Sequence, residues 1–231
     1  MNKMMKKSLV AAMCSLAFLP LVGCGSGKMA AEEYVATAQV TAVDIDVDRA
    51  NITLKVTDGE TKVEYEESEK LKFRVLESGG VLRITEKDLP WYKEAFAGTD
   101  VADIVVYLPA TLGYISAETD RGFVKCEGFT ADEIELSSDR GKITATDLKA
   151  KVAELSSDRG SVNAIRIEVS AVLELSTDRG DITASIRGSQ ADFKTEVEKG
   201  RGSSDISSTS TGAKRLEIET DRGDIRVSFY P

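Results

Sequence analysis

The amino-acid sequence predicts an all-β fold, a β-solenoid whose turns of about 19–22 residues stack from residue 39 to residue 231. One observation is a repeat: Asp-Arg-Gly occurs five times, and a degenerate Gly-Arg-Gly copy fills the one gap in the series. A second is the alternation of apolar and polar residues on both sides of each copy, typical of short strands with one buried face. A unit this small cannot bury its apolar face alone, so we expect successive turns to stack and build a continuous core. The repeated glycines are Gly122, Gly141, Gly160, Gly180, Gly202 and Gly223, which lie 19, 19, 20, 22 and 21 residues apart.

Residues 1–23 are predicted to be a lipoprotein signal peptide. Three lysines in the first seven residues precede an apolar run that ends at Val22, too short to span a bilayer comfortably. The run ends in Leu21-Val22-Gly23-Cys24, which resembles the bacterial lipobox, so we expect Cys24 to carry the lipid and begin the mature chain. An ordinary signal peptide with an incidental cysteine is the alternative. Residues 24–38 then form a flexible tether.

The turns between residues 39 and 110 are expected to be irregular, and those from 111 to 231 regular. Around Ala50 and Gly80 apolar residues follow the register of the repeat without the full motif. Between them and the regular turns lies a segment with Trp91, Tyr92 and Phe96, which we expect to form a protruding loop or short helix. Its rings either cap the solenoid or form an aromatic contact patch for a sugar or a protein.

Three positions of the repeat have predicted structural roles. The glycine is expected to supply the backbone freedom for the bend at each corner. Cys126 occupies a column otherwise filled by alanine or valine, which favours a buried structural thiol over a nucleophile. Small hydroxyl residues precede each glycine by three positions and are predicted to satisfy backbone groups at the corners. These residues are Thr119, Ser138, Ser157, Thr177 and Thr220.

The stacked Asp-Arg pairs are the most conspicuous charged groups. A calcium ladder is disfavoured, because each aspartate is followed by an arginine whose positive charge competes with the metal. We expect a structural ladder in which each arginine bridges aspartates of its own and adjacent turns, with a binding face as the alternative. The residues are Asp120, Arg121, Asp139, Arg140, Asp158, Arg159, Asp178, Arg179, Asp221 and Arg222. Two copies read Arg-Gly-Asp, but the repeat itself demands Arg-Gly, so integrin binding is a minor alternative.

Composition excludes several functions. The 231 residues carry 30 Lys and Arg against 39 Asp and Glu, a net charge of −9, which argues against a nucleic-acid partner. The chain has no histidine, which removes the usual general base and the commonest metal ligand. We therefore expect no catalytic residues, no metal and no cofactor.

The repeated units Leu-Ser-Ser-Asp-Arg-Gly-Lys-Ile and Leu-Ser-Thr-Asp-Arg-Gly-Asp-Ile, after Ile104-Val105-Val106-Tyr107-Leu108-Pro109, resemble the DUF4097 family of adhesin-like bacterial β-strand-repeat proteins. The resemblance covers nearly all of the mature chain. It implies an exported or membrane-attached protein built as a single-stranded right-handed β-helix, and it brings no established catalytic residues. Family repeats more often read Thr-x-Ser-Gly-x-Ile, so the Asp-Arg pair makes the turns of this chain unusually charged.

The function that these observations favour is a non-catalytic, lipid-anchored β-solenoid of the cell envelope. It would sit on the extracytoplasmic side of a cell membrane, or at the cell surface, as an adhesin-like or scaffold module that binds a protein or polysaccharide. One alternative is a polysaccharide-acting enzyme on a β-helix scaffold, which would need unusual carboxylates that break the repeat. The other is a module for envelope-stress sensing or signalling.

Overall fold

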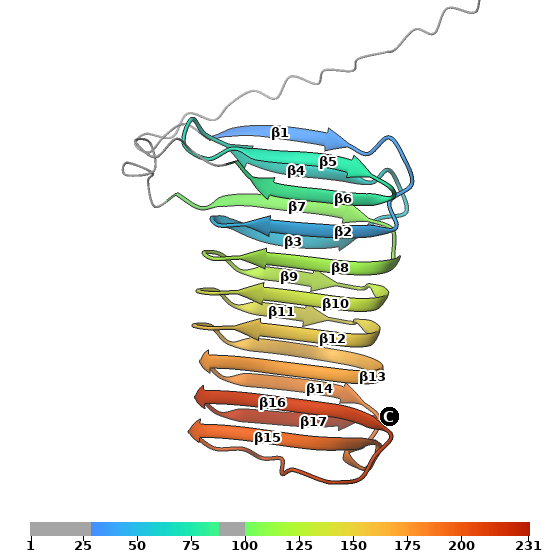
Figure 1. Ribbon diagram of the computed structural model, residues 1–231, viewed down its shortest axis with the longest axis vertical. Coiled ribbons are helices and arrows are strands. Elements are labelled where there is room, and N and C mark those ends of the chain that lie inside the picture. The colour runs from blue at the N-terminus through green and yellow to red at the C-terminus, as the bar shows by residue number, and fades with distance from the viewer. Residues whose placement is uncertain (1–28, 88–99) are drawn as a thin grey trace, which may run out of the picture.

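The computed structural model describes residues 29–87 and 100–231, which form an elongated stack of strands in two facing layers (Figure 1). Along the stack, sheet A consists of β1 (Ala30–Val35), β4 (Lys62–Glu67), β7 (Ala102–Leu108), β3 (Ala50–Val56), β9 (Val124–Glu127), β11 (Ile143–Thr146), residues 162–167 of β13 (Val162–Arg179), β14 (Ile182–Arg187) and β17 (Ile225–Tyr230). Sheet B consists of β5 (Phe73–Ser78), β6 (Val81–Glu86), β2 (Ala42–Val47), β8 (Thr111–Thr119), β10 (Thr130–Ser138), β12 (Lys149–Ser157), residues 168–179 of β13, β16 (Lys214–Arg222) and β15 (Phe193–Arg201). A short 3₁₀ helix, η1 (Gln190–Asp192), precedes β15.

From β8 to β14 the chain passes back and forth between the two sheets. From β10 onward each strand pairs in parallel with the strand one turn earlier, as β10 does with β8 and β11 with β9. The register is almost unbroken, because Ile134 lies opposite Ile115 on one side and Ala153 on the other. The predicted stacking of the repeat is therefore confirmed for these turns.

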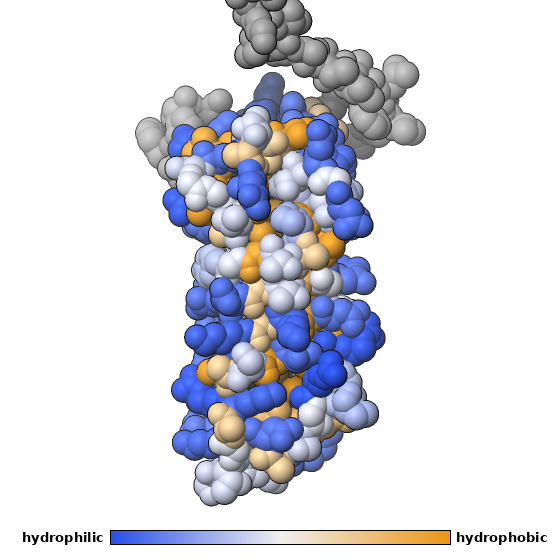
Figure 2. Space-filling model, turned by 90° about the vertical axis from the view of Figure 1, so that its right-hand side faces the viewer, coloured by the Kyte–Doolittle hydropathy of each residue, from blue (hydrophilic) through white to orange (hydrophobic). Residues whose placement is uncertain are grey.

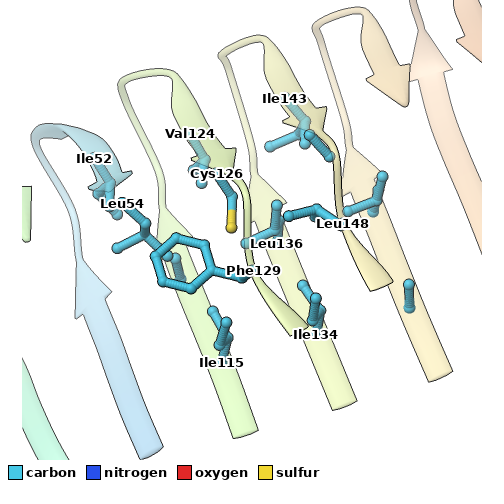
Figure 3. Packing of buried hydrophobic residues seen from close by; sticks show 14 of the residues in the cluster. Ile52, Leu54, Ile115, Val124, Cys126, Phe129, Ile134, Leu136, Ile143 and Leu148 are labelled. Carbon is cyan, nitrogen blue, oxygen red and sulfur yellow. The ribbon is translucent and has the colours of Figure 1, made fainter. Parts of the chain in front are cut away.

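The core lies between the two sheets and runs along the whole stack. Alternate residues of each strand point inward, so that in β10 Ile134 and Leu136 are buried while Glu135 faces outward. Figure 3 shows Cys126 pointing into this core, close to Leu54 and Phe129. Cys126 lies opposite Ala145 and is fully buried, which confirms the predicted structural position.

The glycines of the Asp-Arg-Gly corners lie directly on one another. A Cβ atom added to Gly141 would lie 1.6 Å from the carbonyl oxygen of Gly122, and one on Gly160 would lie 1.9 Å from that of Gly141. No side chain larger than hydrogen fits between corners so closely spaced. The repeat therefore requires glycine mainly because the backbones approach so closely, a stronger reason than the bend expected from the sequence.

The C-terminal turns do not follow chain order, which corrects the predicted single winding. β16 lies between β13 and β15, and β17 pairs with β14. Consequently Gly223 stacks on Gly180, and the degenerate corner at Gly202 lies outside Gly223 at the end of the column. The chain passes over one position in the stack to form β15 and then returns to fill it.

The N-terminal part departs further from the prediction. β2 and β3 lie between β6 and β7 on one side and β8 and β9 on the other, so the first turn of the chain is internal to the stack. The expected turn around Gly80 is wrong: β5 and β6 form an antiparallel hairpin, in which Gly79 and Gly80 adopt φ angles of 60° and 83°. Residues 30–35, expected to belong to the flexible tether, form β1, which pairs antiparallel with β4.

Gly160→Ala tests the close stacking of the corners. The added methyl group would overlap the carbonyl group of Gly141, so we expect the free energy of unfolding to fall by about 2–4 kcal/mol. Chemical denaturation followed by circular dichroism measures this loss. Arg159→Ala at the same corner is the control, because Arg159 is exposed and its truncation should cost less than about 0.5 kcal/mol. Equal stability of the two variants would contradict the close approach.

Candidate functional site

The corners form one continuous edge of the molecule, here called the Asp-Arg-Gly edge. They follow the strands of sheet B at the left of Figure 1, one above another. The backbones of neighbouring corners are directly hydrogen-bonded, as in the bond that Arg179 N donates to Asp158 O at 3.0 Å. The aspartate and arginine side chains of the five full copies are all exposed. Arg201, from the degenerate copy, lies opposite Arg222 and extends the arginine column by one position.

A column of hydroxyl groups lies behind this edge and joins consecutive corners. Ser138 Oγ donates a hydrogen bond to the carbonyl oxygen of Gly122 at 2.9 Å, and Ser157 Oγ donates one to Gly141 O at 2.9 Å. Thr119, Thr177 and Thr220 make the equivalent bond to the corner next to theirs. The predicted role of these residues is confirmed. Because each hydroxyl is buried and already bonded, none is presented as a nucleophile.

The predicted bridging of aspartates by arginines is not observed. Among the described residues, no ion pair within 4.0 Å joins an aspartate and an arginine of the five Asp-Arg-Gly copies. The two residue types instead form adjacent columns of like charge. Burial raises the pKa of the Asp120 carboxyl, and the nearby carboxylates of Asp48 and Asp139 raise it further, against the opposing effect of Arg121. The corners are therefore held together by backbone and hydroxyl bonds.

The turn expected around Ala50 is confirmed, and its corner has the sequence Asp48-Arg49-Ala50. Its alanine replaces the glycine, and a Cβ on Gly122 would lie 2.0 Å from the Ala50 carbonyl oxygen. The side chain of Arg49 is largely buried and pairs at 2.7 Å with Glu86, at the end of the neighbouring strand β6. Glu86 also accepts hydrogen bonds from the backbone N–H groups of Asp48 and Arg49. The apolar register around Ala50 predicted this corner, and the Asp-Arg dipeptide before Ala50 is the further sequence signal that it belongs to the same column.

Sheet B presents a strongly acidic outer face next to the edge. Glutamates from five neighbouring strands occupy one column, six residues before each corner glycine. Their constant distance from the glycines is a sequence signal that could have predicted this column. They are Glu135, Glu154, Glu174, Glu217 and Glu196. Arg215 pairs with Glu174 and with Glu217, and Tyr114 donates a hydrogen bond to Glu135.

Part of this face is a shallow depression with poorly compensated carboxylates. Its lining includes Glu118, Glu135 and Glu154. Burial raises the pKa of the Glu154 carboxyl, and the carboxylates of Glu174, Glu135 and Glu133 add to the effect. Burial likewise raises the pKa of Glu118, with contributions from Asp46, Asp120 and Asp139. The aspartate column of the edge thus belongs electrostatically to the acidic face, which favours contact with cationic groups.

The opposite edge, where the chain returns from sheet A to sheet B, has a different character. Figure 2 shows it as a band of hydrophobic residues between hydrophilic ones. Gly128, Asp147 and Arg166 adopt left-handed backbone conformations there, with φ angles of 85°, 53° and 56°. Arg166 forms an ion pair with Asp147 of the preceding turn. Here, unlike at the Asp-Arg-Gly edge, charges of neighbouring turns neutralise one another.

The described residues, 29–87 and 100–231, offer neither a cluster of metal ligands nor an accessible thiol. No group of three or more Cys, Asp or Glu residues in this part of the chain is arranged to hold a metal ion. Cys126 is buried, and burial raises the pKa of its thiol. Cys24, Trp91, Tyr92 and Phe96 lie outside the described residues, so their predicted roles stay predictions. The described residues include no helix with the length and apolar character that crossing a bilayer requires.

Comparison with known proteins identifies the family. The family model described as Toastrack DUF4097 matches residues 40–230. The chain belongs to this family. The assignment confirms the resemblance seen in the Asp-Arg-Gly units, and the match spans the Toastrack strands from before β2 to the end of β17.

Three solved structures illustrate how far the Toastrack chain resembles other proteins. A "putative cell adhesion protein" from Clostridium sporogenes is 14% identical over 88% of this chain and 100% of its own, with a TM-score of 0.47. A "putative adhesin" from Bacteroides fragilis is 17% identical over 88% of this chain and 98% of its own, with a TM-score of 0.38. A "putative lipid binding protein" from Parabacteroides distasonis is 16% identical over 89% of this chain and 97% of its own, with a TM-score of 0.35. No curated protein matches the chain.

Replacing Glu154 tests the electrostatic cost of the acidic face. The raised pKa means that the folded protein binds a proton more tightly than the unfolded chain, so stability is lost as pH rises past the ordinary glutamate pKa of about 4.3. We expect Glu154→Gln to raise the melting temperature at pH 7 by about 1–2 °C, and to have no effect near pH 3.

The matched control is Glu168→Gln. Hydrogen bonds and ion pairs from Lys149 and Arg187 lower the pKa of Glu168, so its charge stabilises the fold above that pKa. This variant should melt at a lower temperature at pH 7, and the difference should shrink as pH falls. Differential scanning calorimetry between pH 3 and pH 8 measures both variants. Shifts of the same sign at pH 7 would contradict the assigned electrostatics.

Proposed function

We propose that this Toastrack protein is a non-catalytic, adhesin-like or scaffold module, anchored through Cys24 to the extracytoplasmic face of a cell membrane. This proposal rests mainly on the Asp-Arg-Gly edge. Consecutive turns there present the same pair of charged side chains at the spacing of neighbouring strands. An enzyme acting on a polymer needs unusual residues gathered at one place along such a stack. The regular corners favour repeated, weak contacts along an extended partner.

The proposed arrangement has the regular turns wound as a right-handed β-helix. Parallel strands joined by a crossover connection are right-handed in about 98% of cases, which supports this hand. The short apolar run before Cys24 supports the anchor, because it is followed at the expected distance by a small residue and the cysteine. In this arrangement the chain enters the stack at its β1 end, and the long edges face the surroundings of the membrane.

Membrane fractionation tests the anchor. We expect Cys24→Ala to abolish labelling with a fatty-acid analogue and to move the protein out of the membrane fraction, since no other lipid site is proposed. Cys126→Ala is the matched control, because it removes a buried thiol from the core and leaves the lipobox intact. Retention of the Cys24→Ala protein in membranes with full labelling would refute the lipoprotein assignment.

Binding and turnover must be measured side by side to separate a binding module from an enzyme. The full-length protein, purified in mild detergent, is incubated with immobilised polymers and proteins of the cell envelope and with acidic polysaccharides in solution. We expect retention of at least one polymer or protein, and no new reducing ends in any polysaccharide. Turnover that disappears in Asp139→Ala or Asp158→Ala would establish the enzymatic alternative instead.

A further inference from the structure

We propose that the arginine column of the Asp-Arg-Gly edge binds a single chain of an acidic polysaccharide that carries one carboxylate per sugar. The inference rests on the proposed binding function and names the class of partner. The column consists of Arg121, Arg140, Arg159, Arg179, Arg222 and Arg201, in their order along the stack.

The six guanidinium groups of this column are exposed and make no ion pair with any described residue. Several arginines elsewhere on the molecule do pair, such as Arg83 with Asp44, Arg187 with Glu168, and Arg226 with Asp224. Two like charges at neighbouring positions repel each other by about 1 kcal/mol in water. The adjacent aspartates offset part of this repulsion, and the carboxylates of an anionic partner placed directly on the guanidinium groups would offset more of it.

The distance between neighbouring arginines is close to the length of one sugar ring in a polysaccharide. Neighbouring strands lie about 4.8 Å apart, so six arginines on adjacent turns extend over about 24 Å. One pyranose ring of a polysaccharide has a similar length along its chain, so a polymer with one carboxylate per ring carries about as many charges per unit length as the column does. The planar guanidinium group binds a carboxylate through two parallel hydrogen bonds, which suits this pairing better than lysine would.

The acidic face beside the arginines would exclude broad anionic surfaces from the edge. The acidic face of sheet B lies immediately beside the arginines, and Asp120 interacts electrostatically with both Asp46 and Arg121. A broad anionic surface, such as a vesicle, would bring its negative charge against this face and be repelled. A thin single chain lying along the edge can place its carboxylates on the arginines while the rest of the chain stays clear of the acidic face. With a net charge of −9 the protein lacks long-range attraction for polyanions, so affinity must come from many simultaneous short contacts.

The experiment measures binding of polygalacturonate oligosaccharides of increasing length by isothermal titration calorimetry. The full-length wild-type protein is compared with the triple variant Arg140→Gln, Arg159→Gln, Arg179→Gln. The control is Arg83→Gln, Lys149→Gln, Arg187→Gln, which removes the same charge from positions away from the edge. We expect wild-type affinity to rise with length up to about six sugars. It should fall at least about tenfold in the edge variant, and change by less than about twofold in the control.

Salt and other ligands provide the remaining comparisons. The logarithm of the association constant should fall with the logarithm of salt concentration, with a shallower slope for the edge variant. Methyl-esterified oligosaccharide should not bind, because it lacks the carboxylate. Equal or tighter binding of anionic lipid vesicles or polyphosphate would overturn the assignment to a polysaccharide. Circular dichroism melting curves of both triple variants check that any loss of binding does not result from unfolding.

Failure of this inference is distinguishable from failure of the proposed function. If the wild-type protein and the edge variant retain the same cell-envelope polymer equally well, the binding function stands and the arginine column is not its site. If polygalacturonate binds the edge variant as tightly as the wild type, the inference is likewise overturned. Retention of no polymer or protein by the wild type would overturn both proposals.

Discussion

The backbone contact between stacked corners is the constraint on which the rest of the structure depends. The Gly122 carbonyl group lies so close to Gly141 that a methyl group has no room between them, and the same holds along the whole column. Buried hydroxyl groups such as Ser138 Oγ then bind the carbonyl oxygens that the tight corner leaves without a strand partner. Together these contacts fix the register of every turn. Once register is fixed, the alternation within each strand determines which residues enter the core.

Fixed register also determines the surface, because equivalent residues of successive turns must lie side by side. In the interior this produces favourable columns, such as Cys126 beside Ala145. Outside it places glutamate beside glutamate, and burial together with the neighbouring carboxylates raises the pKa of Glu154. At the opposite edge the repeat is less strict, and Asp147 can pair with Arg166 of the next turn. The strictest part of the repeat therefore has the least compensated charge, as expected where surface residues serve binding more than stability.

The sequence was sufficient to predict the regular turns, because their contacts recur at a constant separation along the chain. The corner glycines, the hydroxyl column and the burial of Cys126 all followed from this periodicity. The order of the terminal turns did not, since whether β16 lies inside or outside β15 depends on contacts between strands with nearly equivalent patterns. The hairpin at Gly80 has the same alternation as a solenoid turn and differs only in the direction of its second strand. The unpaired state of the arginines was also missed, because adjacent opposite charges in a sequence do not determine side-chain directions.

The ends of the stack explain why binding is assigned to its long sides. An open edge strand would recruit further strands and lengthen the stack without limit. At the C-terminal end, the segment between β15 and β16 covers both edge strands: Thr209 bridges to Thr195 of β15, and Ser204 bridges to Ile225 of β17. At the other end, the Glu77 carboxylate at the β5 edge accepts a hydrogen bond from Tyr34 of β1. Because the chain covers its own C-terminal end in this way, and identical residues recur only along the stack, a partner longer than one strand finds repeated, identical contacts by lying parallel to the stack.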